Sequence, residues 1–382
     1  MLLTWILVSL FLTLAYIYYI RHYLKNWKAL KPWDIPEGFT STTSISVIIP
    51  IRNEAGKIGP CIESILNNDY PADLLEIIII NDHSSDASIS EIESLRSELV
   101  KIIDLSTHKK PGHFRSHKKW GISKAVDLAE GSLILCTDGD CVVPKEWLNY
   151  FSSYYELTKK EFIAGPVNFI PGSTPLQNFQ ELDMMGVMIM TGAGFESGNG
   201  LLCNGANMAF AKSLFISLNG YEGSEHLSSG DDVFLLHKTA EQFPEKIGFI
   251  KNKACTVYTA SKKNWSSFLN QRLRWATKTS HYQDIFLKIS LTLIFLFHLL
   301  LLINVLLLPF FFRSLIFLFL LQLAVKLIAD RRILSTAVEF FRGQKTIPHF
   351  LQAETIQIAY LILIGFKSIF KKDYEWKGRR TV

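Results

Sequence analysis

Apolar residues are gathered into long uncharged runs near the two ends of this chain, and the middle is mixed. No charged residue occurs from Leu2 to Ile20. Because ~20 apolar residues in a helix cross the hydrocarbon core of a bilayer, this run predicts a transmembrane helix. A cleaved signal peptide is the alternative, but no basic segment precedes the run and no small-residue cleavage motif follows it.

The C-terminal part of the chain has further apolar runs. Ile289–Phe312 has no charged residue, and Ser314–Ala329 has only Lys326. These two runs predict a helical hairpin that turns near Pro309–Arg313. A third run, Leu351–Phe366, is interrupted by polar residues and followed by a basic tail. Spanning would put that tail outside, against the positive-inside rule, so we expect an interfacial or re-entrant helix.

Between Ile45 and Tyr282, short β-branched runs alternate with helix-like segments. The predicted strands are Ile45–Pro50, Glu76–Asn81, Leu99–Asp104, Leu133–Thr137 and Phe162–Val167. The helices predicted between them include Lys57–Asn67, Ser88–Ser97 and Lys118–Ala129. This alternation predicts an α/β domain with a mostly parallel sheet, in which ligands bind at the carboxyl ends of the strands.

The chain therefore divides into three predicted parts. Residues 1–39 form an N-terminal membrane helix with a basic linker, residues 40–285 form the α/β domain, and residues 286–382 form a C-terminal membrane region with a basic tail. The basic residues that follow the first apolar run are Arg21, His22, Lys25, Lys28 and Lys31. Basic residues stay on the cytoplasmic side, so we expect an integral protein of the cell inner membrane, in contact with membrane lipids, with its α/β domain in the cytoplasm.

Charge and cysteine content exclude some classes of protein. The formal net charge of +5 is too small to indicate a nucleic-acid ligand. The five cysteines form no CxxC pair, which argues against a disulfide framework or a zinc site. All of them lie in the polar middle of the chain, as expected in a reducing compartment.

Acidic residues follow two of the predicted strands. Asp138 and Asp140 come directly after the fourth strand, and Asp82 comes directly after the second. Two carboxylates one residue apart can bind a hard cation such as Mg²⁺ together with substrate phosphates, although Asp-Gly is also a common turn dipeptide. The carboxylate of Asp82 can accept a hydrogen bond from a nucleobase or a ribose, while the following Ser85-Asp86 suits a helix N-cap.

The first predicted strand also runs into a polar segment. It ends in Pro50, and Arg52, Asn53 and Glu54 follow. These residues form either a ligand-binding loop or an ordinary surface loop.

Two helical motifs complete the set. Asp231 and Asp232 begin a predicted helix, where acids either stabilise the first turn or supply a general base for an attacking hydroxyl. Gln271, Arg274 and Trp275 share one face of another predicted helix. An amide, a guanidinium and an indole suit a diphosphate and a stacked sugar ring, but a basic face beside a membrane span is the alternative.

In this order and spacing the motifs resemble family 2 glycosyltransferases with the GT-A fold. The match runs from Ile45 to Trp275, with apolar segments on both sides. Within that family the chain resembles the membrane-anchored branch, which includes ceramide, hopanoid and carotenoid glycosyltransferases and the processive synthases of cellulose and hyaluronan. The resemblance implies a GT-A domain, which is Rossmann-like with a mostly parallel sheet, flanked by N-terminal and C-terminal transmembrane helices.

The resemblance implies roles for residues on the donor side. Pro50, Arg52, Asn53 and Glu54 match the end of the family's first strand and its donor-binding loop. Asp82 matches the aspartate that contacts the nucleobase.

Donor and metal roles follow for the next motifs. Lys118 matches the family's lysine before the helix that leads to the DxD strand, and Lys119 is the alternative because the register is ambiguous by one residue. Asp138 and Asp140 match the DxD pair. The resemblance implies that Asp138 contacts the donor and the metal and that Asp140 is the main ligand of Mg²⁺ or Mn²⁺.

The acceptor side carries over in the same way. Gly205 and Ala206, within Cys203–Asn207, match the acceptor loop. Asp232 matches the catalytic base, and Asp231 is the alternative because many relatives have Glu at that position.

The last motifs lie near the membrane. Gln271, Arg274 and Trp275 match QxxRW, with the first two on the donor and Trp275 on the acceptor. The tail Trp376-Lys377-Gly378-Arg379 resembles an ending found in some lipid-glycosylating relatives.

The resemblance implies an inverting, metal-dependent transfer of a sugar from a nucleotide-diphosphate sugar to a lipid or glycan acceptor at the cytoplasmic membrane face. A UDP-sugar is the first expectation and GDP-mannose the second. A processive polysaccharide synthase is one alternative, against which the small membrane region counts. Another is a non-catalytic membrane scaffold with a degenerate transferase domain, against which the acidic residues count. A nucleotidyltransferase would need a glycine-rich basic phosphate loop, which is not visible here.

Overall fold

The computed structural model describes residues 2–227, 229–370, 374–376 and 379–381. These residues form two compact units, each built from several stretches of the chain. The membrane unit comprises Met1–Leu30, Pro171–Gly200 and Ser261–Tyr374, and the sheet unit comprises Lys31–Ile170, Leu201–Ala260 and Glu375–Val382. The three-part division made from the sequence follows chain order and stays a prediction, whereas the compact units bring residues 171–200 to the membrane helices.

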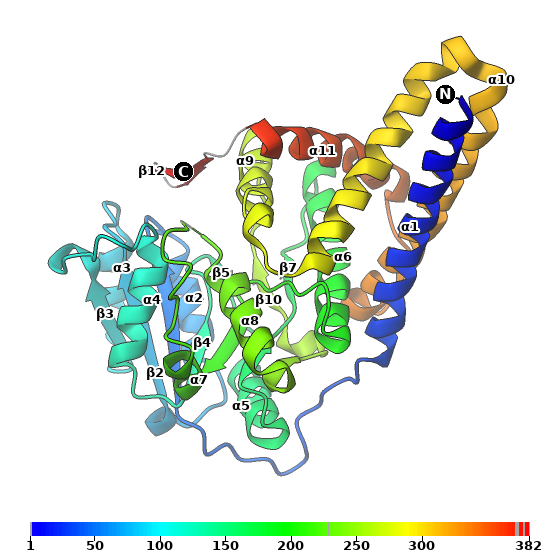
Figure 1. Ribbon diagram of the computed structural model, residues 1–382. Coiled ribbons are helices and arrows are strands. Elements are labelled where there is room, and N and C mark those ends of the chain that lie inside the picture. Colours follow the sequence, from blue (N-terminus) through cyan, green and yellow to red (C-terminus); the bar gives the residue numbers. More distant parts are fainter. Residues whose placement is uncertain (1, 228, 371–373, 377–378, 382) are drawn as a thin grey trace. The chain divides into compact units, whose positions relative to one another are not determined.

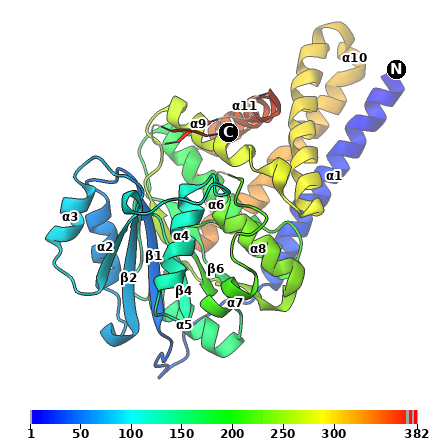
Figure 2. The same ribbon diagram turned by 60° about the vertical axis from the view of Figure 1, so that its left-hand side comes forward.

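A seven-stranded sheet in the order β3, β2, β1, β4, β8, β6, β9 forms the centre of the sheet unit (Figures 1 and 2). Its strands are β1 (Ile45–Ile51), β2 (Leu75–Asn81), β3 (Val100–Asp104), β4 (Leu133–Cys136), β6 (Phe162–Ala164), β8 (Met208–Ala211) and β9 (Ile247–Phe249). Strands β3, β2, β1 and β4 are parallel, as are β6 and β9, while β8 is antiparallel to β4 and β6. The predicted mostly parallel sheet is therefore confirmed.

Helices cover this sheet. They are α2 (Ile58–Leu66), α3 (Ser88–Ser94), α4 (His117–Leu128), α5 (Trp147–Thr158), α7 (Lys212–Ser217) and α8 (Asp231–Gln242), with 3₁₀ turns η1 (Ala72–Leu74), η2 (Leu105–Thr107), η3 (Pro244–Lys246) and η4 (Lys253–Cys255). The strand order reverses direction between β3 and β4, so the right-handed crossover rule puts α4 on the face opposite α2 and α3. Every residue of β2 is buried, as a strand covered on both faces requires.

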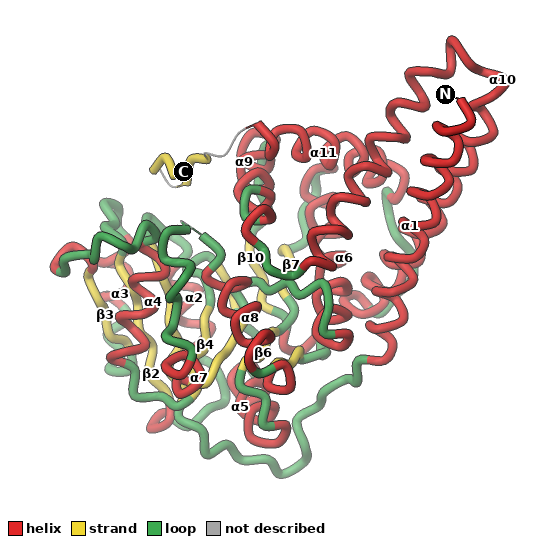
Figure 3. The backbone as a smooth tube through the Cα atoms, viewed as in Figure 1, coloured by secondary structure: helices red, strands yellow, loops and turns green. Residues whose placement is uncertain are grey.

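The carboxyl ends of the parallel strands meet at one edge of the sheet. The loops that follow β1, β2 and β4 emerge there together because these strands run in the same direction (Figure 3). This edge carries the acidic residues predicted from the sequence.

The strand predicted at Phe162–Val167 is wrong in one respect, because two strands in two sheets occupy this region. A second sheet has the order β5 (Cys141–Val142), β10 (Val257–Thr259), β7 (Val167–Phe169). The chain changes sheets at Gly165 and Pro166, where proline has no N–H to continue a ladder. The carbonyl of Pro166 instead accepts from Asn207 Nδ2 at 2.7 Å and from the Val257 N–H at 3.0 Å.

Long helices form the membrane unit. They are α1 (Leu2–Ala29), α6 (Pro175–Ser197), α9 (Trp265–Ala276), α10 (Ile285–Arg342) and α11 (Phe350–Phe370), with the 3₁₀ turn η5 (Thr279–His281). Within the described part of the chain, α1, α10 and α11 are long and apolar enough to cross a membrane. A two-stranded sheet of β11 (Tyr374–Trp376) and β12 (Arg379–Thr381) follows α11.

Helix α10 is a hairpin. Its 58 residues would extend about 87 Å as one straight helix, far more than a bilayer core. The backbone leaves the helical conformation at Phe311, two residues after Pro309. The two arms then run side by side next to α1 (Figures 1 and 2), and Asn304 on one arm donates to Gln322 Oε1 on the other at 2.7 Å. The hairpin predicted from the sequence is therefore confirmed.

A buried group of charged and polar side chains joins the membrane helices. Lys326 is fully buried, and its Nζ contacts Asp330 Oδ2 at 2.6 Å, Gln357 Oε1 at 2.8 Å and the carboxylate of Glu354. The hydroxyl of Tyr16 donates to Asp330. Helices α1, α10 and α11 are thus tied together by one ammonium group and two carboxylates.

Uncharged polar side chains make a second connection between α1 and α10. Trp5 Nε1 donates to Asn304 Oδ1 at 2.8 Å, and Gln322 Nε2 donates to the Ser9 carbonyl at 3.3 Å. Polar groups inside a bilayer need such hydrogen-bond partners because no water is present to replace them.

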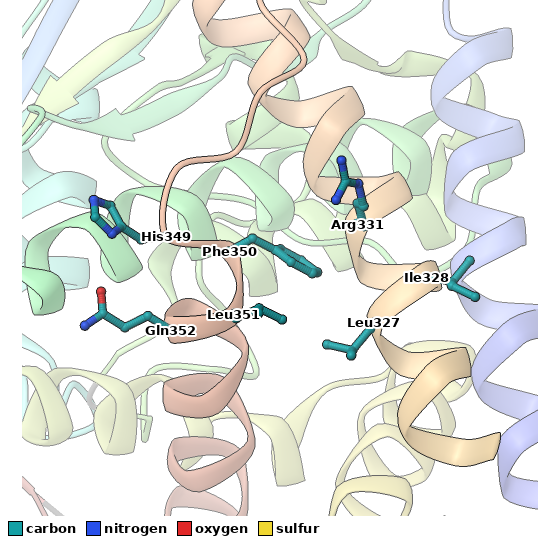
Figure 4. Close-up of a pocket in the computed structure, with 7 residues that line it drawn as sticks. All are labelled: Leu327, Ile328, Arg331, His349, Phe350, Leu351 and Gln352. Atoms are coloured by element: carbon teal, nitrogen blue, oxygen red, sulfur yellow. The ribbon is translucent and has the colours of Figure 1, made fainter. Parts of the chain in front are cut away.

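Helix α11 lies across the α10 hairpin rather than alongside it (Figure 1) and packs on α6, α9 and α10. The interfacial position that the sequence predicts for α11 stays a prediction. A pocket of ≈ 530 Å³ opens where α10 meets the start of α11, lined by Leu327, Ile328, Arg331, His349, Phe350, Leu351 and Gln352 (Figure 4). Phe350 and Leu351 reach toward α10, whereas His349 and Gln352 point away from it (Figure 4).

We expect Lys326→Met to lower the unfolding free energy of the membrane unit by about 3–5 kcal/mol, because it leaves two buried carboxylates without their cation. Lys345→Met is the matched control, since it removes an ion pair to Glu339 whose side chains are 74% and 53% exposed. Exposed pairs contribute little. Thermal unfolding in one lipid or detergent should separate the two variants, and equal midpoints would contradict the importance of the buried group.

Candidate active site

The loop after β1 is bound to the loop after β2. Arg52 Nη1 donates to the Asp82 carbonyl at 2.8 Å and to the His83 carbonyl at 3.2 Å. Asn53 has a left-handed φ of 53°, and its Oδ1 accepts from the Ser85 N–H at 2.8 Å. Arg52 and Asn53, both predicted to bind the donor, thus hold the neighbouring loop in position.

The remaining residues of the first motif are Pro50 and Glu54. Pro50 is half-buried within β1, and Glu54 is only 4% exposed. The Glu54 carboxylate accepts from Lys57 Nζ at 3.0 Å, and its N–H donates to Ser88 Oγ at 2.8 Å. Glu54 therefore links the loop to the starts of α2 and α3.

Asp82 sits at the end of β2 with two histidines beside its carboxylate. Its N–H donates to the Ile51 carbonyl at 2.9 Å, which fixes the backbone at the sheet edge. His83 Nδ1 lies 3.0 Å and His117 Nδ1 3.1 Å from Asp82 Oδ1. His83 is the second residue after β2 and His117 is the first residue of α4, so residues far apart in the sequence meet at this carboxylate.

Lys118 lies between acidic residues from two other segments. Its Nζ is 3.0 Å from Asp138 Oδ1 and 3.0 Å from Asp231 Oδ2. Burial alone would lower the pKa of Lys118, but the carboxylates of Asp138, Asp231 and Asp232 outweigh burial and raise its pKa well above the ordinary value. The ammonium group is therefore held charged amid these carboxylates.

The structure separates Lys118 from Lys119. Lys119 is fully buried, its Nζ donates to the Ser224 carbonyl at 2.7 Å, and it lies 4.8 Å from the Phe234 ring centroid. Adjacent helical residues point in different directions. Of the two registers that the sequence left open, Lys118 is the one beside the acidic residues.

Asp138 and Asp140 lie in the turn between β4 and β5. The Cys141 N–H donates to the Asp138 carbonyl at 3.1 Å, which closes the turn, and a Cβ on Gly139 would lie 2.8 Å from Ile51 Cγ2. Glycine therefore lets this turn approach β1 closely. The Asp138 side chain is 41% exposed, and Asp140 is half-buried.

Helix α8 brings its first two residues to the same edge. Asp231 is buried against Lys118, whereas Asp232 is half-buried. Asp232 Oδ2 accepts from the Gly205 N–H at 3.1 Å, and its Oδ1 accepts from the Val233 N–H at 2.8 Å. Asp232 is thus one of the two acids in the first turn of α8, whose N-cap is Gly230, and its carboxylate also contacts the loop of Gly205.

The predicted acceptor loop is part of this group. A Cβ on Gly205 would lie 3.3 Å from Asp231 Oδ2 and 3.6 Å from Lys118 Nζ. The Ala206 N–H donates to Asn204 Oδ1 at 3.1 Å. The backbone of Gly205 therefore lies close to these charged groups, and a side chain there would crowd the Asp231 carboxylate.

Helix α9 belongs to the membrane unit and carries Gln271, Arg274 and Trp275, each half-buried. Gln271 Oε1 is buried without a hydrogen bond to any described residue. The buried guanidinium is that of Arg272, which pairs with Asp183 on α6 at 2.8 Å and lies 4.3 Å from the Trp275 ring centroid. Burial raises the pKa of Asp183, and Arg272 opposes that shift.

Some residues of the site were missed by sequence reasoning. His83 and His117 are adjacent to motif residues, and Arg272 lies inside QxxRW. Their contacts with Asp82 and Asp183 could not be predicted from the neighbouring residues in the sequence. Asn207 Oδ1 accepts from Trp147 Nε1 at 2.8 Å, and the Asn207 N–H donates to the Asn204 carbonyl of the acceptor loop at 3.0 Å. In the predicted tail motif, Lys377 and Gly378 lie outside the described residues.

Comparison with known proteins agrees with this geometry. Residues 46–217 match the profile described as glycosyl transferase family 2, and residues 133–338, more than half of the chain, match glycosyl transferase family group 2. The chain belongs to the family 2 glycosyltransferases.

Curated relatives of this family 2 chain are distant. It is 24% identical over 262 residues to the probable glycosyltransferase YdaM of Bacillus subtilis, a match that covers 67% of this chain and 59% of YdaM. It is 22% identical over 111 residues to the beta-monoglucosyldiacylglycerol synthase of Synechocystis sp., covering 29% of this chain and 22% of that protein. The chain thus spans less than two thirds of these relatives.

A solved structure resembles the chain over most of its length. The mannosyltransferase PcManGT from Pyrobaculum calidifontis, in complex with GDP-Man and Mn²⁺, has a TM-score of 0.57 and 19% identity, over 97% of this chain and 98% of that chain. This likeness confirms the GT-A fold of the family 2 chain.

We expect Lys118→Met to destabilise the sheet unit by up to about 3 kcal/mol at neutral pH, because it leaves buried Asp231 without its cation. The raised pKa of Lys118 means that its contribution is fully present below pH 10.5, the ordinary pKa, and is lost only as pH rises through the folded-state pKa. The variant should therefore be less stable than the parent across pH 6–9.

Lys124→Met, on the same helix and half-buried, is the matched control. Unfolding by chemical denaturant, followed by tryptophan fluorescence, compares the variants. A Lys118→Met protein as stable as the control would contradict this account.

Proposed function

We propose that this family 2 chain transfers a sugar from a nucleotide-diphosphate sugar to a lipid or glycan acceptor at a membrane face. The observation that carries the proposal is the meeting of Lys118, Asp138, Asp231 and Gly205 at the carboxyl edge of the sheet. Such an edge is where α/β sheets bind ligands. Acidic residues for a metal, a cation for phosphate and a carboxylate for an acceptor hydroxyl are the groups that this reaction needs.

Asp138 and Asp140 are the proposed metal ligands. They fit Mg²⁺ or Mn²⁺ because both supply carboxylate oxygen and the Asp138 side chain is 41% exposed. A bound ion would neutralise charge on the departing diphosphate. The complex of PcManGT with GDP-Man and Mn²⁺ supports divalent metal use here without distinguishing the two ions.

Asp232 is the proposed base, and Asp231 is the less suitable candidate. Asp231 is 5% exposed and its Oδ2 lies 3.0 Å from Lys118 Nζ, so a proton on it would have to displace an ion pair. Asp232 is more accessible, and the Gly205 N–H orients its carboxylate. In this proposal Asp232 takes the proton of the acceptor hydroxyl as that oxygen attacks the anomeric carbon from the face opposite the leaving group, which inverts the configuration.

Other residues would bind the substrates. Asp82 would accept from the nucleobase, and Arg52 would hold the loop that carries Asp82. Lys118 would add positive charge where the diphosphate gains negative charge.

The QxxRW residues have separate support. We propose that Gln271 and Arg274 bind the donor and that Trp275 binds the acceptor. The support for these roles is the motif and its position on α9. The buried Arg272 stacks on Trp275 and would hold the indole in one orientation.

A UDP-sugar is the proposed donor, with GDP-mannose second. The proposal of a lipid acceptor is supported by the three long apolar helices and by the pocket at the start of α11, where Arg331 stands beside apolar Leu327 and Phe350 (Figure 4). The name of the Synechocystis relative points the same way. We further propose that the sheet unit faces the cytoplasm at the inner membrane, because basic residues follow the first span.

A screen of UDP- and GDP-sugars with Mg²⁺ or Mn²⁺, on the full chain in lipid, tests the function. We expect metal-dependent release of one nucleotide, and a loss of about 10²–10⁴-fold in rate in Asp232→Asn because a general base contributes this much. Extraction of labelled product into organic solvent identifies a lipid acceptor, and a ladder of long products identifies a processive synthase. No release from any donor, with total membrane lipids present, would support the non-catalytic scaffold.

Trp275→Ala should raise the KM for the acceptor while leaving nucleotide binding nearly unchanged, because the indole is proposed to stack on the acceptor. Trp265→Ala, an exposed tryptophan at the start of the same helix, is the matched control. Acceptor titrations and nucleotide binding isotherms measure the two effects. Equal loss of donor and acceptor binding would disprove this role.

A further inference from the structure

Three side chains at the end of β2 converge on a point that the proposed reaction does not explain. Asp82, His83 and His117 each direct one ligand atom there, and these atoms all lie within 4.8 Å of one another. Asp82 is buried, His117 is half-buried and His83 is exposed. The group is therefore open to solvent on one side and fixed on the other.

The separations suit a shared metal ion. Asp82 Oδ1 is 3.0 Å from His83 Nδ1 and 3.1 Å from His117 Nδ1. Ligands at the metal distances of zinc sites, about 2.0–2.2 Å, are separated from one another by about 2.9–3.4 Å in octahedral or tetrahedral geometry. Two of the three separations thus already match a shared ion, and the two histidine nitrogens lie within 4.8 Å of each other.

Hydrogen bonding accounts for only part of this arrangement. His83 Nδ1 is within hydrogen-bonding geometry of Asp82, but His117 Nδ1 is buried and makes no hydrogen bond within the described part of the chain, although it lies 3.1 Å from the same oxygen. A bound metal ion would give this buried imidazole nitrogen, which lies beside a carboxylate without a hydrogen bond, a partner.

The ligands are also held in advance. His83 has a left-handed φ of 57°, and its carbonyl accepts from Arg52 Nη1. His117 begins α4, whose N-cap Ser116 accepts from the Lys119 N–H at 3.2 Å. The His83 and His117 rings meet edge to face, with centroids 5.5 Å apart. A preorganised first shell is the main requirement of a metal site.

We propose that Asp82, His83 and His117 form a site for a borderline transition-metal ion of the Zn²⁺ class. Two imidazoles and one carboxylate favour Zn²⁺ or Co²⁺, whereas the all-carboxylate pair Asp138 and Asp140 favours the harder Mg²⁺ or Mn²⁺. The chain therefore has two sites of different chemistry at one sheet edge. Solvent supplies the remaining ligands on the exposed side.

The site has a regulatory consequence, which rests on the proposed function. The carboxylate of Asp82 is the one proposed to bind the nucleobase, and it cannot bind an ion and a base N–H at once with the same oxygen. Binding of the metal and of the nucleoside part of the donor therefore compete. Zn²⁺ inhibits transfer by raising the apparent KM for the donor, and a chelator restores it.

The experiment uses Co²⁺ as a spectroscopic probe on the full chain in lipid, without nucleotide. We expect a d–d absorption band that saturates at one ion per chain and is displaced by Zn²⁺. His117→Gln and His83→Gln should each weaken Co²⁺ binding at least about tenfold, since even indirect partners of a metal ligand change affinity by this much. His113→Gln, an exposed histidine on the preceding loop, should bind as the parent does.

Two outcomes would overturn the site: absence of a saturable band in the parent, or equal affinity in the parent and both histidine variants. Thermal unfolding of each variant shows whether a loss of binding comes from a loss of folding. Uridine and guanosine, which lack phosphates that chelate metals, then test the competition. Co²⁺ binding that neither nucleoside weakens would overturn the coupling to the donor while leaving the metal site intact, so failure of one part is distinguishable from failure of the other.

Discussion

The ammonium group of Lys118 is the interaction on which the arrangement of the candidate site depends. Asp138 reaches it from the turn after β4 and Asp231 from the start of α8, and Gly205 lets a third loop approach without a side chain in the way. Without a cation among them, these carboxylates would repel one another at short range. The parallel strands bring the loops to one edge of the sheet. The charge of Lys118 allows the acidic residues of these loops to lie close together.

The sequence was a good guide to the parts of this edge that are set locally. Apolar runs predicted β1, β2 and β4 to within a residue or two, because a strand covered on both faces must be apolar throughout, and the more exposed β3 was predicted equally well. Acidic residues directly after such strands had to lie at the carboxyl edge, so Asp82 and Asp138 were found. Roles assigned to these residues rest on the family resemblance, and the structure supplies only their positions.

What the sequence could not give are contacts between distant segments. Neither the pairing of Arg272 with Asp183 nor the meeting of His83 and His117 leaves a periodic signal, because each depends on how separate elements pack. The change of sheet at Pro166 was missed for a related reason, since the strand residues on both sides look alike and only the partner strands differ. The same limit applies to α6, because chain order cannot show that it packs with the membrane helices.

The polar connections of α1 have a consequence for biosynthesis. Tyr16 and its partner Asp330 are 314 positions apart in the chain. At a synthesis rate of about 5–20 residues per second, Asp330 is made about 15–60 s after Tyr16. During this interval the Tyr16 hydroxyl has no partner from α10, so the buried polar group can form only after the hairpin has been made.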